Sequence, residues 1–154
     1  MDADWEKCLF SRRSVTGYLV YLGGSLVSWK SKKQSNVSRS STESEYRALG
    51  SITCELKWIL KLLHDLCIKT NLPVDIFCDN ESAIKLALNP VFHEKTKHFE
   101  IDLHFVREKI ENGILKVNKI VSSNQNADIL TKSLGSVQHE YIVNRLNMID
   151  VFKK

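Results

Sequence analysis

The sequence predicts a single α/β domain, because three patterns of different period follow one another along its 154 residues. A hairpin pattern comes first, in which residues 16–22 and 25–29 are rich in β-branched and aromatic side chains and flank Gly23-Gly24. A long helical stripe follows. A short apolar run at 73–78 is then typical of a strand that is covered on both faces. Antiparallel pairing followed by alternating helix and strand indicates an α/β fold.

The long helix is predicted from about residue 41 to Cys67, because Thr42 and Glu45 have the spacing of a capping box. Counting from Glu45 at alternating intervals of four and three residues, which is the spacing of one helix face, every position is apolar. These positions are Leu49, Ile52, Leu56, Ile59, Leu63 and Leu66. The same steps from Glu43 meet a mixed face, which we expect to be solvated. Glu45 therefore heads the buried stripe, where an unpaired charge is costly. The alternative is that Glu45 only closes the capping box.

The rest of the chain continues the alternation, with no repeat, low-complexity tract or linker, so that one domain over residues 1–154 is expected. A helix is predicted to open at Asp79-Asn80 and to run to about Leu88. The remaining predictions are a helix at 99–111, a strand at 114–121, a helix at 124–134 that Gly135 ends, and a helix at 137–148.

Composition permits a polyanionic partner without requiring one, since 22 Lys and Arg stand against 18 Asp and Glu, for a net charge of +4. No apolar stretch approaches the roughly 20 residues of a membrane span, so no membrane association is expected. The four cysteines, Cys8, Cys54, Cys67 and Cys78, show neither CxxC spacing nor a secretory signal. We therefore expect reduced thiols in an intracellular protein, cytoplasmic or nuclear and not secreted.

Acidic residues stand where predicted elements begin or end. Asp79 ends a strand and precedes a helix, although capping that helix would also explain it, and Asn80 can fill that role too. Asp128 lies in the first turns of its helix, where the macrodipole alone would favour an acid. Near the amino end, spacing cannot choose between Asp2 and Asp4. Carboxylates are the ligands that Mg²⁺ prefers, and two such ions about 4 Å apart can clamp a phosphodiester. The pattern predicts nuclease chemistry.

Seven strings in collinear order make the chain resemble one family over nearly its whole length. They are DADW at 2–5, RRSVTGY at 12–18, LGGSLVSWKSKKQ at 22–34, VSRSSTESEYRA at 37–48, FCDNESAI at 77–84, NPVFHEKTKHFEIDLHFVRE at 89–108 and ADILTK at 127–132. The chain thereby resembles the ribonuclease H domain of copia-type retrotransposon Pol polyproteins. The resemblance implies a ribonuclease H-like fold: a five-stranded mixed sheet, with three antiparallel strands and then parallel ones, flanked by helices on both faces.

The resemblance also implies the site and its chemistry. The catalytic and metal-binding carboxylates would be Asp2, Glu45, Asp79 and Asp128, which would hold two Mg²⁺ or Mn²⁺ ions. The implied reaction is endonucleolytic hydrolysis of the RNA strand of an RNA–DNA hybrid during reverse transcription, with other Pol domains as possible partners. The residues expected to contact nucleic acid are Lys30, Lys32, Lys33, Arg39, Asn80, Lys97 and His98.

Some positions depart from the family pattern. Met1 stands directly before Asp2, so we expect a first strand truncated at its amino end. Glu6-Lys7 replaces a small Ala-Gly pair, and Lys119 and Val121 replace a His and a Pro. These departures keep an alternative open, a catalytically weak or inactive retrotransposon-derived fragment that only binds nucleic acid. An interaction protein that reuses the scaffold is a third possibility.

A zinc site is not expected. His93, His98 and His104 lie near Asp102, but no CxxC pair follows them to complete the pattern of a zinc finger.

Overall fold

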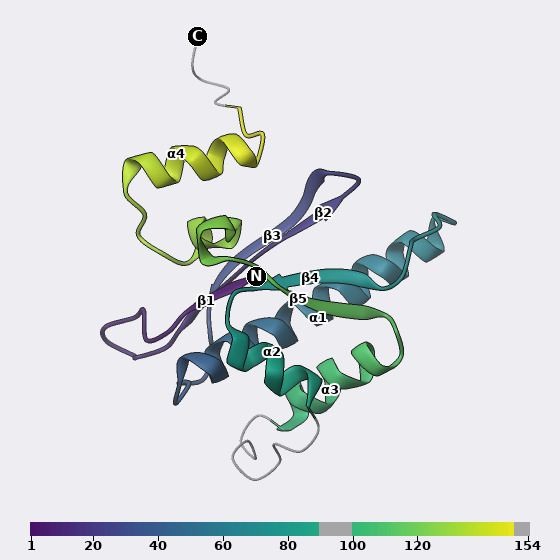
Figure 1. The fold of residues 1–154 in the computed structure, drawn as a ribbon, viewed down its shortest axis with the longest axis horizontal. Coiled ribbons are helices and arrows are strands. Elements are labelled where there is room, and N and C mark those ends of the chain that lie inside the picture. The colour runs from purple at the N-terminus through teal and green to yellow at the C-terminus, as the bar shows by residue number, and fades with distance from the viewer. Residues whose placement is uncertain (90–99, 150–154) are drawn as a thin grey trace.

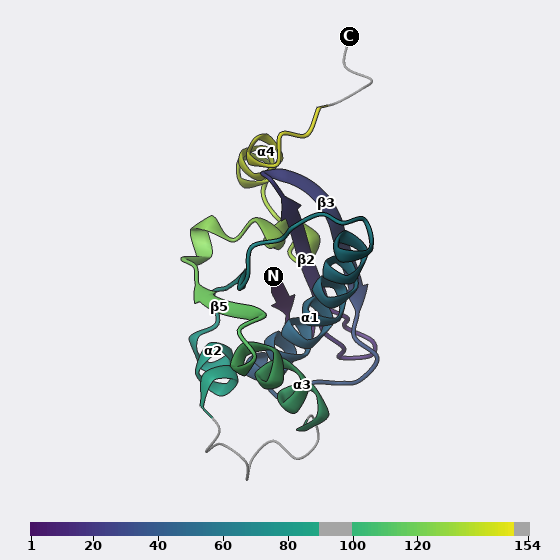
Figure 2. The same cartoon turned by 90° about the vertical axis from the view of Figure 1, so that its right-hand side faces the viewer.

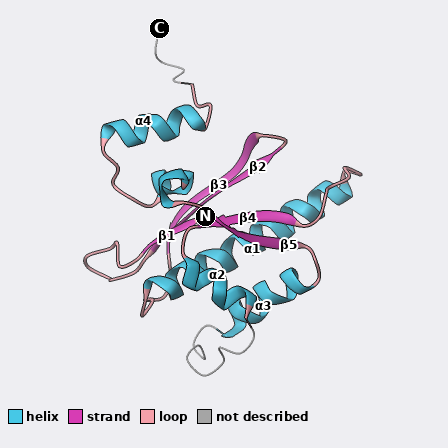
Figure 3. Cartoon of the chain, viewed as in Figure 1, coloured by secondary structure: helices cyan, strands magenta, loops and turns pink. Residues whose placement is uncertain are grey.

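A computed structural model describes residues 1–89 and 100–149 of the chain. Within those residues it shows strands of both pairing senses and four α-helices, which confirms an α/β protein (Figures 1 and 3). None of the described helices is long and apolar enough to cross a bilayer. The elements are β1 (Asp2–Asp4), β2 (Val15–Leu22), β3 (Ser25–Lys33), α1 (Ser41–Asp65), β4 (Val74–Cys78), α2 (Glu81–Leu88), α3 (Glu100–Glu111), β5 (Leu115–Lys119), the 3₁₀ helices η2 (Ser122–Asn124) and η3 (Asn126–Leu130), and α4 (Ser136–Arg145).

The strands form two hydrogen-bonded sheets where one continuous five-stranded sheet was expected. β1, β2 and β3 are antiparallel neighbours, and β4 and β5 pair in parallel. The two sheets meet at the amino end of β1, where the Met1 amine donates to the carbonyl oxygen of Phe77 at 2.9 Å. Figure 2 shows this amino end between β2 and the helical layer. β1 has three residues, so it is too short to join β2 and β4 along their length.

Helix α1 supplies the core against which β1 and β2 pack. Of its predicted apolar stripe, Leu49, Ile52, Leu56 and Leu63 are buried and Ile59 is half-buried, but Leu66, after the end of the helix, is 61% exposed. Glu45 heads the stripe with 5% of its surface exposed. The prediction of a solvated face from Glu43 is wrong for the first half of the helix, where Glu43, Tyr46 and Thr53 are buried. The reason is nonlocal: α3 covers this face, and the Tyr46 hydroxyl donates to the carbonyl of Leu103 at 3.4 Å.

The start of α1 differs from the expected capping box in a way that matters for the site. Ser40 is the N-cap, and its hydroxyl accepts the backbone N–H of Glu43 at 3.1 Å. The carboxylate of Glu43 reaches back to the backbone N–H of Arg39 at 2.9 Å. The Thr42–Glu45 box is therefore wrong by two residues. Because Glu43 does the capping, Glu45 is not needed there and projects from the next turn towards β1.

Helices lie on both sides of the strands. α1, α2 and α3 contact one another on one side, while η3 packs on β2 from the other and α4 packs on η3 (Figure 1). The predicted helix at 124–134 is wrong, because the segment forms two 3₁₀ helices. Gln125 caps η3 by accepting the N–H of Ala127 at 3.4 Å, and its amide nitrogen donates to the Met1 carbonyl at 2.7 Å. These contacts tie the segment to the residue that precedes β1.

The packing of η3 on β2 depends on the missing side chain of Gly17. A Cβ at this position would lie 2.6 Å from Cγ2 of Thr131 and 3.2 Å from the carbonyl oxygen of Ala127. Gly17 is also the partner of Asp2 in the β1–β2 register. η3 can therefore approach the strand next to Asp2 because residue 17 is glycine.

We predict that Gly17→Ala lowers the free energy of unfolding by about 1–3 kcal/mol, because backbone atoms of η3 would have to move away. Urea denaturation measures the change. Gly135→Ala is the matched control, since no heavy atom lies within 4 Å of a Cβ there and its φ of −65° suits any residue. Equal effects of the two substitutions would contradict close packing at Gly17.

Candidate metal-binding carboxylate site

Asp2 lies at the centre of the candidate site. Its side chain, on β1, is 1% exposed. One carboxylate oxygen accepts a short hydrogen bond from the Thr131 hydroxyl, and the other lies 3.3 Å from the Lys132 ammonium. Asp4, which spacing alone could not exclude, instead pairs with Lys7 at 2.9 Å. The structure therefore brings Asp2, and not Asp4, into the cluster.

Glu45 approaches the same strand from α1. Its Oε1 accepts the backbone N–H of Ala3 at 3.0 Å, and its Oε2 lies 4.0 Å from the Cys78 thiol, which donates to it. Burial is the main cause that raises the pKa of Glu45 to about 8, and the charge of Asp2 adds to this effect. The hydrogen bond from Ala3 acts in the opposite direction. The carboxyl group is held in place but is costly to ionise.

Asp79 follows β4 and completes this half of the site. The side chain of Asn80 caps α2 by accepting the N–H of Ala83 at 2.9 Å, so the alternative that Asp79 is the cap is wrong. Ligand atoms of Glu45, Cys78 and Asp79 lie within 4.8 Å of one another. Asp79 is half-buried, which leaves it accessible from solvent.

Asp128 enters the site from η3, opposite Glu45. Its side chain is 7% exposed, and its Oδ1 accepts a hydrogen bond from Lys132 at 2.8 Å. Burial raises the pKa of Asp128, and the charges of Asp2 and Asp79 raise it further, against the effect of Lys132. Burial lowers the pKa of Lys132, but the contacts with Asp128 and Asp2 outweigh this and hold it above its ordinary value.

Asp2, Glu45, Asp79 and Asp128 therefore form one group from four separate elements, called the acidic cluster below. Each of Glu45 and Asp128 has its pKa raised by two other members, which places all four carboxyl groups within electrostatic reach. Up to four negative charges face the ammonium of Lys132 and the buried amine of Met1, which interacts with Asp2, Glu45 and Asp79. Divalent cations would relieve this repulsion, and binding of such ions by the cluster stays a prediction.

The protonation state of Cys78 affects which metal ion would suit the acidic cluster. Burial and the neighbouring Glu45 raise the pKa of its thiol to about 12, so it stays protonated at neutral pH. The thiolate is the form that binds metals. The remaining donors are carboxylate oxygens, which suit Mg²⁺ or Mn²⁺ better than a softer ion. All four cysteines are free.

A second feature, the basic groove, lies between the β2–β3 hairpin and the first half of α1. It has a volume of about 440 Å³ and is lined by Arg13, Lys30, Lys32, Lys33 and Arg47, together with Asp102. The register places Lys32 opposite Thr16, which in turn pairs with Ala3 next to Asp2. Two strand spacings separate Ala3 from Lys32, which is about 10 Å. The groove therefore lies two strands from β1, and none of the described residues that line it belongs to the acidic cluster.

The other predicted nucleic-acid contacts have different positions. Arg39 is exposed just before α1. The side-chain oxygen of Asn80 is occupied by its cap, and its contact with substrate stays a prediction. Lys97 and His98 lie outside the described residues, as does His93.

Sequence reasoning missed the residues that hold the carboxylates, chiefly Thr131, Lys132 and Gln125. The i, i+4 spacing of Asp128 and Lys132 within ADILTK is a signal for the ion pair. The contact of Lys132 with Asp2 joins residues 130 positions apart and has no local signal. Arg47 was missed too; it contributes to the basic groove while pairing with Glu43 at 2.9 Å.

Comparison with known proteins relates the chain to transposon polyproteins. It is 43% identical over 150 residues to the retrovirus-related Pol polyprotein from transposon RE2 of Arabidopsis thaliana, and 42% identical over 150 residues to that from transposon RE1. Each alignment covers 97% of this chain and 10% of the polyprotein. The Pol polyprotein from transposon TNT 1-94 of Nicotiana tabacum is 39% identical over 131 residues, 85% of this chain and 10% of that protein.

The chain thus spans about a tenth of the length of these relatives and is homologous to one segment of retrovirus-related Pol polyproteins. No protein-family model matches the sequence. No solved structure matches it either.

The raised pKa of Glu45 predicts a pH dependence of stability in metal-free protein. A carboxyl group whose pKa is higher in the folded than in the unfolded chain retains its proton on folding, so stability falls as pH rises between the two values. We expect the free energy of unfolding to fall between about pH 4.5 and pH 8, by an amount on the order of a few kcal/mol. Glu45→Gln should flatten this dependence. Urea denaturation in chelator measures it, and an unchanged slope in the variant would contradict the assignment to Glu45.

Lys132 supplies a second prediction, because its ammonium contacts the carboxylates of Asp2 and Asp128 that a divalent cation would contact. Lys132→Met should tighten Mn²⁺ binding about tenfold, or about 1.4 kcal/mol, and should lower the stability of the metal-free protein. Isothermal titration calorimetry measures the affinity. Lys7→Met is the matched control, since Lys7 pairs with Asp4 outside the cluster. Weaker Mn²⁺ binding in Lys132→Met would show that the ammonium supports the metal site instead of competing for it.

Proposed function

We propose that this chain is a ribonuclease H-like domain of a copia-type retrotransposon Pol polyprotein, an endonuclease that cleaves the RNA strand of RNA–DNA hybrids. The observation that carries the proposal is the acidic cluster, in which Asp2, Glu45, Asp79 and Asp128 reach one site from β1, α1, the end of β4 and η3. Homology to one segment of Pol polyproteins supports a polynucleotide-processing role. Three antiparallel strands followed by two parallel strands, with helices on both sides, agree with a ribonuclease H-like arrangement.

The four carboxylates of the cluster would hold two Mg²⁺ or Mn²⁺ ions. Such a pair of ions, when bound, activates a water molecule as the nucleophile and stabilises the departing 3′ oxygen. The protein needs no covalent nucleophile of its own, and the protonated Cys78 is not required as one. What the chain supplies is negative charge at fixed positions.

The contacts of each carboxylate determine how well it is fixed. Thr131 and Lys132 hold both oxygens of Asp2, and the N–H of Ala3 holds one oxygen of Glu45, which leaves Oε2 directed towards Cys78 and Asp79. Ligand positions in such sites must be maintained within about 0.5 Å for full activity. Hydrogen bonds from neighbouring groups are the usual means.

The basic groove is suited to the phosphates of a hybrid whose scissile strand lies over the acidic cluster. Lys32 and Lys33 stand across β2 from Ala3 and Asp4, and Lys30 lies over the ring of Tyr18 at 5.7 Å. Arg39 would extend this surface. Phosphate contacts position a duplex without reading its sequence. Selection of the RNA strand requires groups near the cluster that sense 2′-hydroxyls, for which Asn80 and backbone amides are candidates.

The test is cleavage of a labelled RNA–DNA hybrid by the purified chain with Mg²⁺ or Mn²⁺. Asp79→Asn should reduce the rate at least about a hundredfold, since it removes one charge from the metal ligands. Its stability without metal should hold or rise, because repulsion within the cluster falls. Asp65→Asn, at the exposed end of α1, is the matched control and should leave the rate unchanged.

Two outcomes would count against the proposal. Cleavage that persists in Asp79→Asn would place the activity elsewhere. Salt-sensitive hybrid binding without cleavage by the unmodified chain would support the alternative, a retrotransposon-derived protein that only binds nucleic acid.

A further inference from the structure

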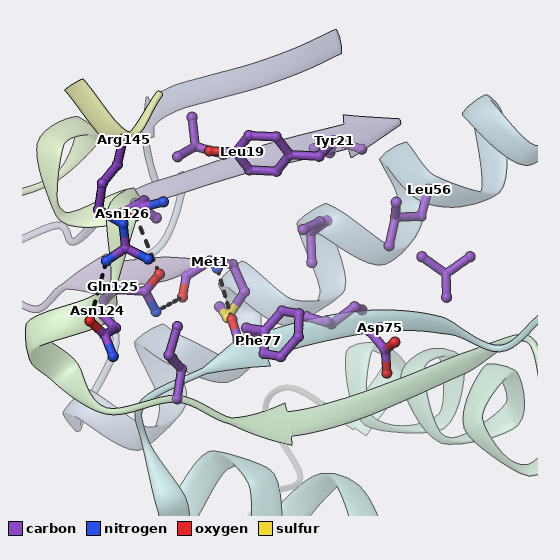
Figure 4. A pocket seen from close by; sticks show the side chains of 16 residues that line it. Met1, Leu19, Tyr21, Leu56, Asp75, Phe77, Asn124, Gln125, Asn126 and Arg145 are labelled. Carbon is purple, nitrogen blue, oxygen red and sulfur yellow. Dashed lines mark hydrogen bonds between the residues drawn. The ribbon is translucent and has the colours of Figure 1, made fainter. Parts of the chain in front are cut away.

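The loop between β1 and β2, residues 5–14, carries two neighbouring apolar side chains that nothing in the described chain covers. Leu9 is 84% exposed and Phe10 is 102% exposed. Other accessible apolar residues are placed differently. Tyr21 and Phe77, for example, line a cavity of about 380 Å³ between β2 and β4 (Figure 4). Phe10 has no such surroundings, so both faces of its ring are open to a ligand.

Backbone hydrogen bonds hold Leu9 and Phe10 at the tip of a closed turn. The N–H of Arg12 donates to the carbonyl of Cys8 at 2.7 Å, and the N–H of Cys8 donates to the carbonyl of Arg13 at 3.2 Å. Arg12 has a positive φ of 52°, a conformation that residues other than glycine rarely adopt. The tip is therefore a defined structure that presents an aromatic ring to solvent.

Cations flank the tip and connect it with the basic groove. Arg13 and Lys33 line that groove, and the Lys33 ammonium donates to the Cys8 sulfur at 3.6 Å. Arg12 pairs with Glu6 at 3.2 Å, and its side chain is exposed. Exposed pairs of this kind are weak, so a phosphate can take the place of Glu6 at little cost. The loop thus combines an open ring with positive charge that continues into the basic groove.

The loop also lies close to the acidic cluster. It leaves β1 three residues after Asp2, and Figure 1 shows it extending beyond the carboxyl end of that strand. Lys7 of the loop donates to the Ser133 hydroxyl at 3.3 Å, and Ser133 follows Lys132, which contacts Asp2. A nucleic-acid strand bound at the cluster and the groove would therefore pass this loop where it leaves the protein.

We propose that the loop binds an unpaired nucleobase, which stacks on Phe10 beside Leu9 while Arg12 and Arg13 contact phosphates of the same strand. This inference rests on the proposed nucleic-acid substrate and adds to it a site for single-stranded nucleic acid that flanks the duplex. Stacking of a base on an aromatic ring is tolerant of sequence. A base inside a duplex exposes only its edges, so an open ring face suits an unpaired base better.

An anionic lipid surface is the alternative ligand for an apolar tip with basic neighbours. Two side chains bury little apolar area, however, and the cations at Arg13 and Lys33 continue into a groove of about 440 Å³. A strand that alternates phosphates with flat bases fits a groove that ends at an aromatic ring. The arrangement therefore favours nucleic acid.

The test compares a labelled blunt RNA–DNA hybrid with the same hybrid carrying a single-stranded DNA overhang at each end. Fluorescence anisotropy of each probe with the full chain measures affinity, and Ca²⁺ replaces Mg²⁺ so that binding is measured apart from cleavage. The unmodified chain should bind the overhang probe about tenfold more tightly. Phe10→Ala should lose this preference and Phe10→Trp should keep it. Neither change should alter the melting temperature, because the side chain is fully exposed.

Leu72→Ala is the matched control for Leu9→Ala. Leu72 is 53% exposed and precedes β4, at the end of that strand opposite to Asp79. It should leave both affinities unchanged, whereas Leu9→Ala should weaken the overhang preference. Arg13→Gln should lower the slope of log affinity against log salt concentration by about one, while Phe10→Ala should leave that slope unchanged. The two readouts separate stacking from charge.

Equal affinity of the unmodified chain for the two probes, or a preference that survives in Phe10→Ala, would overturn the proposal. Binding to phosphatidylglycerol vesicles that Phe10→Ala abolishes, with no change for either hybrid probe, would assign the loop to a lipid surface instead. None of these measurements involves cleavage. Loss of the overhang preference in Phe10→Ala, together with no hybrid cleavage in Mg²⁺, would sustain the loop assignment while the proposed function failed. Cleavage without an overhang preference would do the reverse.

Discussion

Repulsion among buried carboxyl groups is the constraint on which the rest of the structure depends. Four acidic side chains from distant parts of the sequence share one site, and burial makes the ionised forms of Glu45 and Asp128 costly. Neutral hydrogen bonds from the Thr131 hydroxyl and the Ala3 amide hold the group together, with the ammonium of Lys132 and the amine of Met1 beside it. Each of these contacts requires η3 or α1 to approach β1 closely. Gly17 and the Ser40 cap are the local features that permit that approach.

The acidic cluster and the basic groove create fields of opposite sign about two strand spacings apart, which is about 10 Å. At physiological salt this separation is close to the screening length, so a polyanion in the groove would only partly feel the repulsion of the carboxylates. Arg47, which lines the basic groove, is paired with Glu43 and lies 4.0 Å from Asp102. Part of the positive charge is thus already balanced within the protein, and Lys30, Lys32 and Lys33 carry most of what remains for a ligand.

Local patterns were sufficient to predict the hairpin, the buried stripe of α1 and the strand that ends before Asp79. They failed where several neighbouring residues could fill the same structural role, or where contacts with an element distant in sequence determined the structure. The run at 38–42 contains several Ser and Thr residues that could cap α1, so the choice of Ser40 depends on the backbone at Arg39. Asp2 and Asp4 lie on the same face of β1 because side chains alternate along a strand. The ion pair of Asp4 with Lys7 is what distinguishes their roles. The packing of η3 on β2 at Gly17 joins segments more than 100 residues apart, and no local pattern encodes it.

The ion pair between Asp128 and Lys132 has a consequence for local motion. η3 is a single short turn whose contacts are mostly with other parts of the fold, so it is a natural unit of partial opening. If it detached, Asp128 and Lys132 would leave together, and the charge of the site would not change. The carboxylates that remained, Asp2, Glu45 and Asp79, would then lose the ammonium of Lys132 and keep the amine of Met1 beside them. Reclosing would restore the contact of Lys132 with Asp2 as well as the packing on β2, so attraction between charges as well as packing favours the closed position of η3.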